Sequence, residues 1–534
     1  MANQPLNQTQ KRNPWAQKCL NWASRLSHPV LLSTIATSAV VLTVRTIGGF
    51  QGLELGAYDQ MIRLRSTLNS DQRILVVGID ESDIQSRREW PIKDSTLSEL
   101  LDVLLASEPT AVGLDLFRDV PIGEGHDALL THIQNDNRVV AVCRISSPDI
   151  PGIPPPAETP ETQVGFSDLV VDPGGILRRS LLVAQPPATG IATPSHLCND
   201  PHTQLFSLSF QLTLQYLAAQ GIAPELTPKQ EIKLGETVFP RLTTNFGGYR
   251  NIDAAGYQLL INFRAAHNSV PQVSLSAVLS GEVPTEQIRD RIVLIGVTTP
   301  EAQDDFYTPY SGGLRDSQKM PGVTVHAQSV SQMLSAVLDN RPLLWSWPTP
   351  IEGVWIVIWG LGGALFAWHV RRPLRFTIGA AGLLGILYGT CYVLLLQAGW
   401  IPVVPPALSL ALAASGVVLL DRFNKSAYGQ AVYKQMKSLL RLDIEIDTTR
   451  VGQQVAEITE TDYFANLQKQ ARELRKRREA QSTGATPSAI ENKVPKRELH
   501  SPKIAKTSEN MDDYFDNLKR EARRLKSSDF KQND

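Results

Sequence analysis

The chain has 534 residues, a hydrophobic fraction of 42%, and nearly balanced charge, with 52 Lys and Arg against 53 Asp and Glu. This balance argues against a nucleic-acid-binding protein that depends on overall positive charge. Four cysteines in so long a chain exclude a disulfide-rich scaffold, and their spacing matches no metal cluster. Apolar and charged residues are nevertheless strongly segregated along the chain.

The first apolar segment, residues 30–47, follows a basic N-terminus of residues 1–29. Its only interior charge is Arg45, and no clear small-residue cleavage site follows it. A secretory signal peptide would carry such a site, so we predict a retained transmembrane helix.

Three further apolar segments are predicted to cross a membrane, at residues 351–370, 376–396 and 403–420. Each is close to the ~20 residues that span the hydrocarbon core, and none carries a charge at its centre. Glu352 lies at an edge, where we expect its carboxylate to reach water.

The linkers between these three segments are short, so we expect the segments to form a tight bundle. The middle segment has a surface of small residues, which permits close helix contact. Its glycines are Gly379, Gly382, Gly385 and Gly389.

The distribution of basic residues predicts the orientation. The turn at 371–375 carries three arginines, whereas the turn at 397–402 carries no charge. Because Lys and Arg favour the cytoplasmic side, both termini are predicted to be cytoplasmic and residues 48–348 to lie outside. Residues 51–348 contain 21 Lys and Arg against 34 Asp and Glu, while residues 421–534 contain 23 against 18. An acidic outer domain is thus joined to basic inner parts.

The outer segment has the pattern of an α/β domain. Short apolar runs at 73–80, 111–115 and 138–143 suit buried strands, and helical patterns at 95–106 and 127–134 alternate with them. This order predicts a mostly parallel or mixed sheet. After a loop-rich region, the expected elements are a helix at 205–219, strands at 231–238, 258–263 and 291–297, and a helix at 323–338.

Short motifs follow one another in a fixed order. They are Leu55–Asp59, Val77–Glu81 followed by Trp90 and Pro91, Leu260–Arg264, Asp290–Gly296, and Met320–Val323 with Val325–Ala327. In this order, and between one apolar segment and three closely spaced ones, they resemble the CHASE type 2 domain, a bacterial extracytoplasmic sensor module. The resemblance covers about residues 50–420 and implies signal input at a bacterial plasma (inner) membrane.

Proteins of that family usually end in a cyclase or a kinase, and this chain departs from the pattern. Residues 421–534 contain no Gly-Gly-Asp/Glu-Glu-Phe run and no kinase glycine loop. Nor does the chain carry a nucleophile elbow, a phosphate loop or a zinc-protease motif. We therefore expect no catalytic residue, no metal and no cofactor, and no enzymatic activity.

Four acidic residues are candidates for binding an extracytoplasmic ligand. Asp80 and Asp115 each end a predicted strand, and Asp304 and Asp305 follow the strand at 291–297. In open α/β sheets, ligands bind beyond the carboxyl ends of the strands. The alternative is that these side chains cap helices or hold turns.

Other residues of the outer domain have two interpretations each. Cys143 and Cys198 can form a disulfide in an oxidising compartment, but Cys143 also suits a buried strand position. His326 is expected to be a satisfied structural histidine, the alternative being a ligand or catalytic group. Arg178 and Arg179 are expected to be a solvated surface pair, the alternative being that they bind an anion.

The tail contains an internal repeat, with residues 462–474 and 513–525 identical at eight of thirteen positions. In each copy, apolar residues recur at helical spacing. The expected partner-binding residues are Tyr463, Phe464, Leu467 and Leu474, and Tyr514, Phe515, Leu518 and Leu525. Each copy either docks into a groove of a cytoplasmic protein, lies on the inner leaflet, or has no specific partner. The remainder of the tail is predicted to be largely disordered.

These features predict a multi-pass membrane sensor that detects an extracytoplasmic small molecule or protein and communicates with cytoplasmic partners through the tail motifs. The alternative is a constitutive membrane scaffold that recruits proteins through the same motifs. Under either interpretation the protein is also expected to contact the lipid bilayer and not to bind nucleic acid. A homodimer is a further possible partner arrangement.

Overall fold

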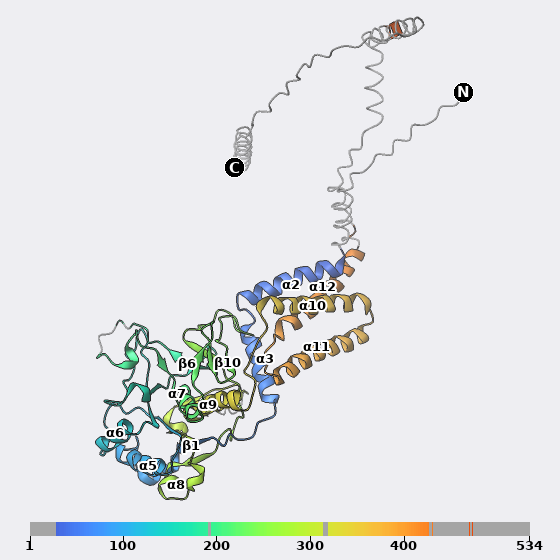
Figure 1. Cartoon of the computed structure of the whole chain (residues 1–534). Coiled ribbons are helices and arrows are strands. Elements are labelled where there is room, and N and C mark those ends of the chain that lie inside the picture. Colours follow the sequence, from blue (N-terminus) through green and yellow to red (C-terminus); the bar gives the residue numbers. More distant parts are fainter. Residues whose placement is uncertain are drawn as a thin grey trace, which may run out of the picture. The chain divides into compact units, whose positions relative to one another are not determined.

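The computed structural model describes residues 28–188, 190, 194–312, 319–426, 430, 469, 472 and 473. These residues form an α/β domain and a set of long apolar helices (Figure 1). The eight candidate partner-binding residues of the tail, Tyr463, Phe464, Leu467, Leu474, Tyr514, Phe515, Leu518 and Leu525, lie outside the described residues.

The α/β domain is built on a six-stranded, wholly parallel sheet, which confirms the predicted fold class. Its strands, in spatial order, are β12 (Gln272–Ser274), β1 (Ile74–Ile79), β13 (Ile292–Val297), β2 (Ala111–Asp115), β3 (Val139–Cys143) and β4 (Val164–Phe166). Strand β1 is buried along its whole length. Such continuous apolar runs mark strands that are covered on both faces.

Successive side chains of β1 enter different cores. Ile74 and Val76 pack with α7 (Leu208–Ala219) and α9 (Gly322–Leu338), whereas Leu75 and Val77 face the opposite side. That side is covered by α4 (Glu81–Arg87), α5 (Asp94–Ala106), α6 (His126–Asn135) and α8 (Leu275–Leu279). Each buried aliphatic side chain contributes roughly 1.5–3 kcal/mol, so both helical layers hold the sheet in place.

Smaller antiparallel sheets complete the domain. The first contains β11 (Tyr257–Leu260), β6 (Leu177–Ala184), β5 (Val170–Val171) and β7 (Leu205–Phe206); the others are β10 (Thr237–Phe239), β9 (Ile232–Leu234) and β8 (Pro224–Leu226), and β14 (Asp305–Phe306) with β15 (Met320–Pro321). Short 3-10 turns occur at Glu161–Gln163, Leu197–Asn199, Thr285–Gln287 and Pro300–Ala302.

Two predicted elements differ from the structure. The expected strand at 231–238 is a hairpin of β9 and β10, because Gly235 adopts a φ of +58° and reverses the chain. The expected helix at 205–219 begins only at Leu208, since the Ser207 hydroxyl caps it and residues 205–206 pair with β6 instead.

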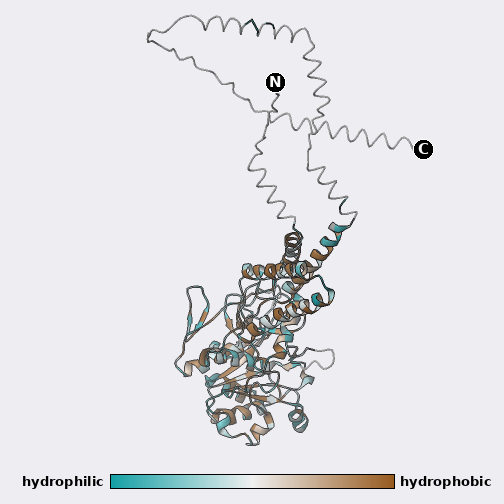
Figure 2. Ribbon diagram, turned by 90° about the vertical axis from the view of Figure 1, so that its right-hand side faces the viewer, coloured by the Kyte–Doolittle hydropathy of each residue, from teal (hydrophilic) through white to brown (hydrophobic). Residues whose placement is uncertain are grey.

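Among the described residues, four helices are long and apolar enough to cross a membrane, in agreement with the sequence prediction. They are α2 (Pro29–Thr46), α10 (Thr349–His369), α11 (Pro373–Leu396) and α12 (Val404–Lys425). The hydrophobic colouring of these helices is visible in Figure 2. A further helix, α3 (Gln51–Leu64), follows α2 and was not predicted.

The predicted bundle of the last three apolar segments is wrong, because α2 takes the place expected for α11. Gly360 and Gly363 of α10 face α12, where an added Cβ would meet Ser409 and Leu410 at 2.4 and 2.3 Å. Gly416 of α12 faces α2, where an added Cβ would clash with the Ser33 hydroxyl.

Helix α11 diverges from the other three (Figure 1). In the part of the chain that is described, no atom lies within 4 Å of a Cβ added at three of its four predicted contact glycines, Gly382, Gly385 and Gly389, and the fourth, Gly379, meets only Phe366. Small residues permit two helices to approach closely. Here the glycines of α10 lie against α12, whereas, among the described residues, three of the four glycines of α11 have no other helix against them.

Candidate functional site

Asp80 of the predicted ligand site has a structural partner. Its carboxylate accepts a hydrogen bond from the backbone N–H of Asp83 at 2.9 Å, and the Asp83 carboxylate accepts one from the backbone N–H of Asp80 at 3.1 Å. The two residues form a capping box at the start of α4. Asp305 is likewise paired, with Lys319 at 2.9 Å.

Asp115 and Asp304 are brought into electrostatic contact at the carboxyl edge of the sheet. Burial raises the pKa of Asp115 to about 7. Burial, and then the nearby Asp115, raise the pKa of Asp304 to about 6. Two carboxylates in a poorly solvated site favour retention of a proton.

His326 belongs to the same buried edge and is hydrogen-bonded, with Nδ1 2.8 Å from the Ser209 hydroxyl. Burial lowers its pKa to about 4, so the imidazole is neutral near pH 7. Among the described residues, no group of three potential ligands could hold a metal ion. The assignment of Asp80, Asp115, Asp304 and Asp305 to a ligand stays a prediction.

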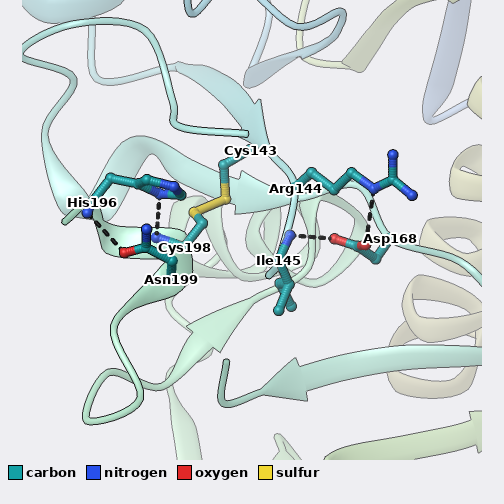
Figure 3. Close-up of a disulfide and its surroundings, with 7 residues drawn as sticks. All are labelled: Cys143, Arg144, Ile145, Asp168, His196, Cys198 and Asn199. Carbon is teal, nitrogen blue, oxygen red and sulfur yellow. Dashed lines mark hydrogen bonds and ion pairs between the residues drawn. A yellow bond between two sulfur atoms is a disulfide. The ribbon is translucent and has the colours of Figure 1, made fainter. Parts of the chain in front are cut away.

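A disulfide joins Cys143, at the end of β3, to Cys198 in a loop segment (Figure 3). Cys143 is therefore both a buried strand residue and half of a disulfide. His196 also holds the loop around Cys198. Its ring accepts the backbone N–H of Cys198 at 3.2 Å, and its backbone N–H donates to the side-chain oxygen of Asn199 at 2.9 Å. The disulfide therefore ties the loop to the sheet, and the hydrogen bonds fix the turn around Cys198.

Buried charges join the α/β domain to the apolar helices, and we call this region the junction. Glu352 in the first turn of α10 pairs with Arg45 in the last turn of α2, and with Arg250 of the α/β domain at 3.0 Å. Arg45 and Arg250 also donate to the Gly247 carbonyl oxygen, at 3.3 and 3.0 Å. The expectation that Glu352 reaches water is wrong, since it is 1% exposed and two arginines neutralise it.

Glu54 of α3 closes the junction at the start of α12. Its two carboxylate oxygens accept the backbone N–H groups of Val403 and Val404, at 2.7 and 2.8 Å. These groups lack partners within the helix, and an acidic side chain suits the positive end of the helix dipole. Burial nevertheless raises the pKa of Glu54 to about 7.

Trp400, in the turn between α11 and α12, inserts into the α/β domain and is fully buried. The centroid of its ring lies 4.6 Å from the ring centroid of Tyr58 on α3 and 5.4 Å from that of Tyr249. A Cβ added at Gly247 or Gly248 would stand 2.5 or 2.6 Å from the indole ring, so only glycine allows this approach. The turn is thus packed against the domain.

A second buried network links β6 to α3. Arg178 binds Asp59 through two hydrogen bonds of 2.8 and 2.6 Å, and Asp172 through one of 2.6 Å. Arg179 donates to the other Asp172 oxygen at 2.8 Å, and the Tyr249 hydroxyl donates to Asp172 at 2.7 Å. The expected solvated arginine pair is therefore wrong, because both guanidinium groups are buried and paired.

Sequence reasoning missed these two networks because the contacts that join their different elements, such as Arg178 with Asp59, lie far apart in the chain. Arg45 and Glu352 are separated by 307 residues and Glu54 and Val403 by 349. One signal was available: Arg45 and Glu352 are single charges near the ends of apolar segments, and such charges need a partner.

The junction can transmit displacement, since moving one charged partner unpairs another in a poorly solvated environment. It lies where the domain meets α2, α10 and α12.

The CHASE2 domain model matches residues 36–365, which is more than half of the chain. No significant similarity to a curated protein or to a solved structure was found. The chain belongs to the CHASE2 family, a family of extracytoplasmic sensor domains, and it is a membrane protein.

Proposed function

We propose, with membership of the CHASE2 family as the premise, that this protein senses a stimulus outside the cytoplasm and reports it to cytoplasmic partners. In this proposal the protein lies in a bacterial inner membrane, with four crossings and both termini in the cytoplasm. The protein is not itself an enzyme, and its output passes to other proteins.

Three features support this orientation. The arginine-rich turn at 371–375 and the basic last turn of α12, with Arg422 and Lys425, lie on one side, and the uncharged turn at 397–402 lies on the other. The turn at 397–402 packs against the α/β domain through Trp400, as an outer turn should. The disulfide in the α/β domain suits an oxidising compartment.

The observation that carries the sensory mechanism is the pairing of Arg250 with Glu352 and Arg45. A rearrangement that withdraws Arg250 leaves Glu352 with one partner, and breaking a buried ion pair costs about 3–5 kcal/mol. Domain and helices therefore move together more easily than apart. A ligand drives this movement only if it binds two domain states with different affinity.

A topology experiment tests the orientation. Single cysteines are placed at exposed Leu226 in the α/β domain and at Gln481 in the tail, in a chain whose Cys19 and Cys391 are replaced by serine. A membrane-impermeant maleimide added to intact spheroplasts should label position 226 and spare position 481 until the membrane is opened. Labelling of position 481 alone contradicts the proposal.

Partner capture tests the output. Native membranes carrying the intact chain should retain cytoplasmic partners that the double variant Phe464→Ala, Phe515→Ala loses. Equal recovery by both chains rejects the docking role of the repeats.

The scaffold alternative is separated by uncoupling the junction. Arg250→Gln should change partner recovery under a sensor mechanism, and the exposed Arg289→Gln variant serves as its matched control. Unchanged recovery in Arg250→Gln favours a constitutive scaffold.

A further inference from the structure

A large cavity lies away from both the junction and the acidic edge of the sheet. It has a volume of about 750 Å³ and is bounded by the end of β6, by β7 and α7, and by the small sheet of β8 and β9. Cavities of roughly 300–1,000 Å³ hold small organic ligands. Neither the family match nor the proposed mechanism assigns it a role.

The walls of the cavity are largely apolar. Phe206 and Phe210 form an edge-to-face pair with ring centroids 5.3 Å apart, and Leu214 lines the same side. Phe206 and Leu226 are 38% and 64% exposed, although both are large apolar residues. Exposed apolar side chains that gather around a concave site indicate a binding surface.

Tyr257 contributes its ring and not its hydroxyl. The hydroxyl accepts the Ile232 N–H at 2.8 Å and donates to the Phe239 carbonyl oxygen. With both its donor and one acceptor position occupied, it fixes the β8–β10 sheet against β11. The polar selectivity of the cavity must therefore come from other side chains.

The charges that line the cavity are not balanced. Glu225 pairs with Lys233 at 3.3 Å, so its charge is partly neutralised. Within the described ranges, Arg241 has no ion pair and no hydrogen bond, and its side chain is exposed at the cavity. A free guanidinium favours a carboxylate or another planar anion, which it can bind through two hydrogen bonds.

We propose that this cavity is a ligand site of the sensor, distinct from the acidic sheet edge, and that it binds a small organic anion with a flat or branched apolar body, such as an aromatic carboxylate. The apolar body lies against Phe206 and Phe210, and the anionic group pairs with Arg241. This inference deepens the proposed sensory function and rests on it for its biological meaning.

The position of the cavity suits transmission to the membrane helices. Val183 and Ala184, at the end of β6, line the cavity, while Arg178 near the start of the same strand binds Asp59 of α3. Helix α3 follows α2 after a short turn. Strand β6 thus connects the ligand site to a helix next to the first span.

Direct binding to the full-length protein in lipid nanodiscs tests the proposal. The probes are 2-naphthoate and its uncharged counterpart 2-naphthamide, measured by titration calorimetry with empty nanodiscs as the blank. The wild type should bind the carboxylate about tenfold more tightly than the amide, since one charge-assisted contact has about that effect. Arg241→Gln should abolish this difference and leave binding of the amide unchanged.

Charge reversal and a matched control complete the experiment. Arg241→Glu should prefer 2-naphthylmethylamine, which is cationic, whereas Arg289→Gln, an exposed arginine elsewhere on the domain, should behave as wild type. Equal affinity of 2-naphthoate for wild type and Arg241→Gln overturns the proposal, as does the absence of saturable binding by either neutral or anionic probe. Because binding is measured directly, a failure of transmission to the tail leaves this result unaffected.

Discussion

Replacement of Asp115 by asparagine tests the electrostatics of the acidic sheet edge. Asp115 ends β2 as a half-buried residue, and the loss of water around its carboxyl group raises its pKa from an ordinary 3.8 to about 7. Between these two pH values, the folded state therefore keeps a proton that the unfolded chain has already released. The contribution of this group to the free energy of unfolding is therefore fully present below pH 3.8 and is lost as the pH rises toward 7.

The size of the effect follows from the gap between the two pKa values. At 1.36 kcal/mol for each pH unit, the gap corresponds to ~4 kcal/mol as an upper bound. Asparagine has nearly the same shape and cannot ionise. Asp115→Asn should therefore match wild type near pH 4 and exceed its free energy of unfolding by a few kcal/mol at pH 8.

Pulse proteolysis of the full chain in urea, at a series of pH values, measures this difference. Asp119→Asn is the matched control, because Asp119 lies on the same loop and is exposed. The pKa of Asp304 should fall in Asp115→Asn, since Asp115 is one of the groups that raise it. Parallel pH profiles for wild type and Asp115→Asn would refute a buried, proton-retaining carboxyl group.

Three further predictions concern the junction and the disulfide. Arg250→Gln should destabilise the folded chain by about 3–5 kcal/mol in urea unfolding, because Glu352 remains buried with one fewer partner, whereas an unchanged midpoint would show the pair to be dispensable. Gly248→Ala should displace Trp400, since the new Cβ would lie 2.6 Å from its ring; hydrogen exchange in the 397–403 turn should rise, and unaltered exchange would contradict this packing. Cys143→Ser should lower the free energy of unfolding by ~4 kcal/mol, the value for closing a loop of 55 residues, and the reduced wild type should show the same loss.

The fold class was predictable because burial leaves a local trace in the sequence. Strands covered on both faces appear as continuous apolar runs, as in β1 and β13, and the intervening helices show amphipathic spacing. Helix α3 was missed although its buried residues recur at helical spacing, because charged residues interrupt the apolar pattern there.

The candidate site was predictable only in part. The residues that end parallel strands could be placed at one edge, and the structure does bring Asp115 and Asp304 together. It gives Asp80 to a helix cap and Asp305 to Lys319, because side chains pair with whichever neighbour folding brings within reach. Arg241 carries no sequence signal that separates it from other exposed arginines.

The sequence by itself determined the parallel α/β domain, the four apolar helices and the segregation of charge, since each is a property of a segment and its own solvent environment. Only the tertiary structure decided that α2 and not α11 packs with α10 and α12, and that Glu352 is buried between two arginines. The contacts of Glu352 with Arg250 and Arg45 join residues 102 and 307 positions apart, and the contact of Ser33 in α2 with Ala413 in α12 joins residues 380 apart. Complementarity over such separations exists only once the chain has folded.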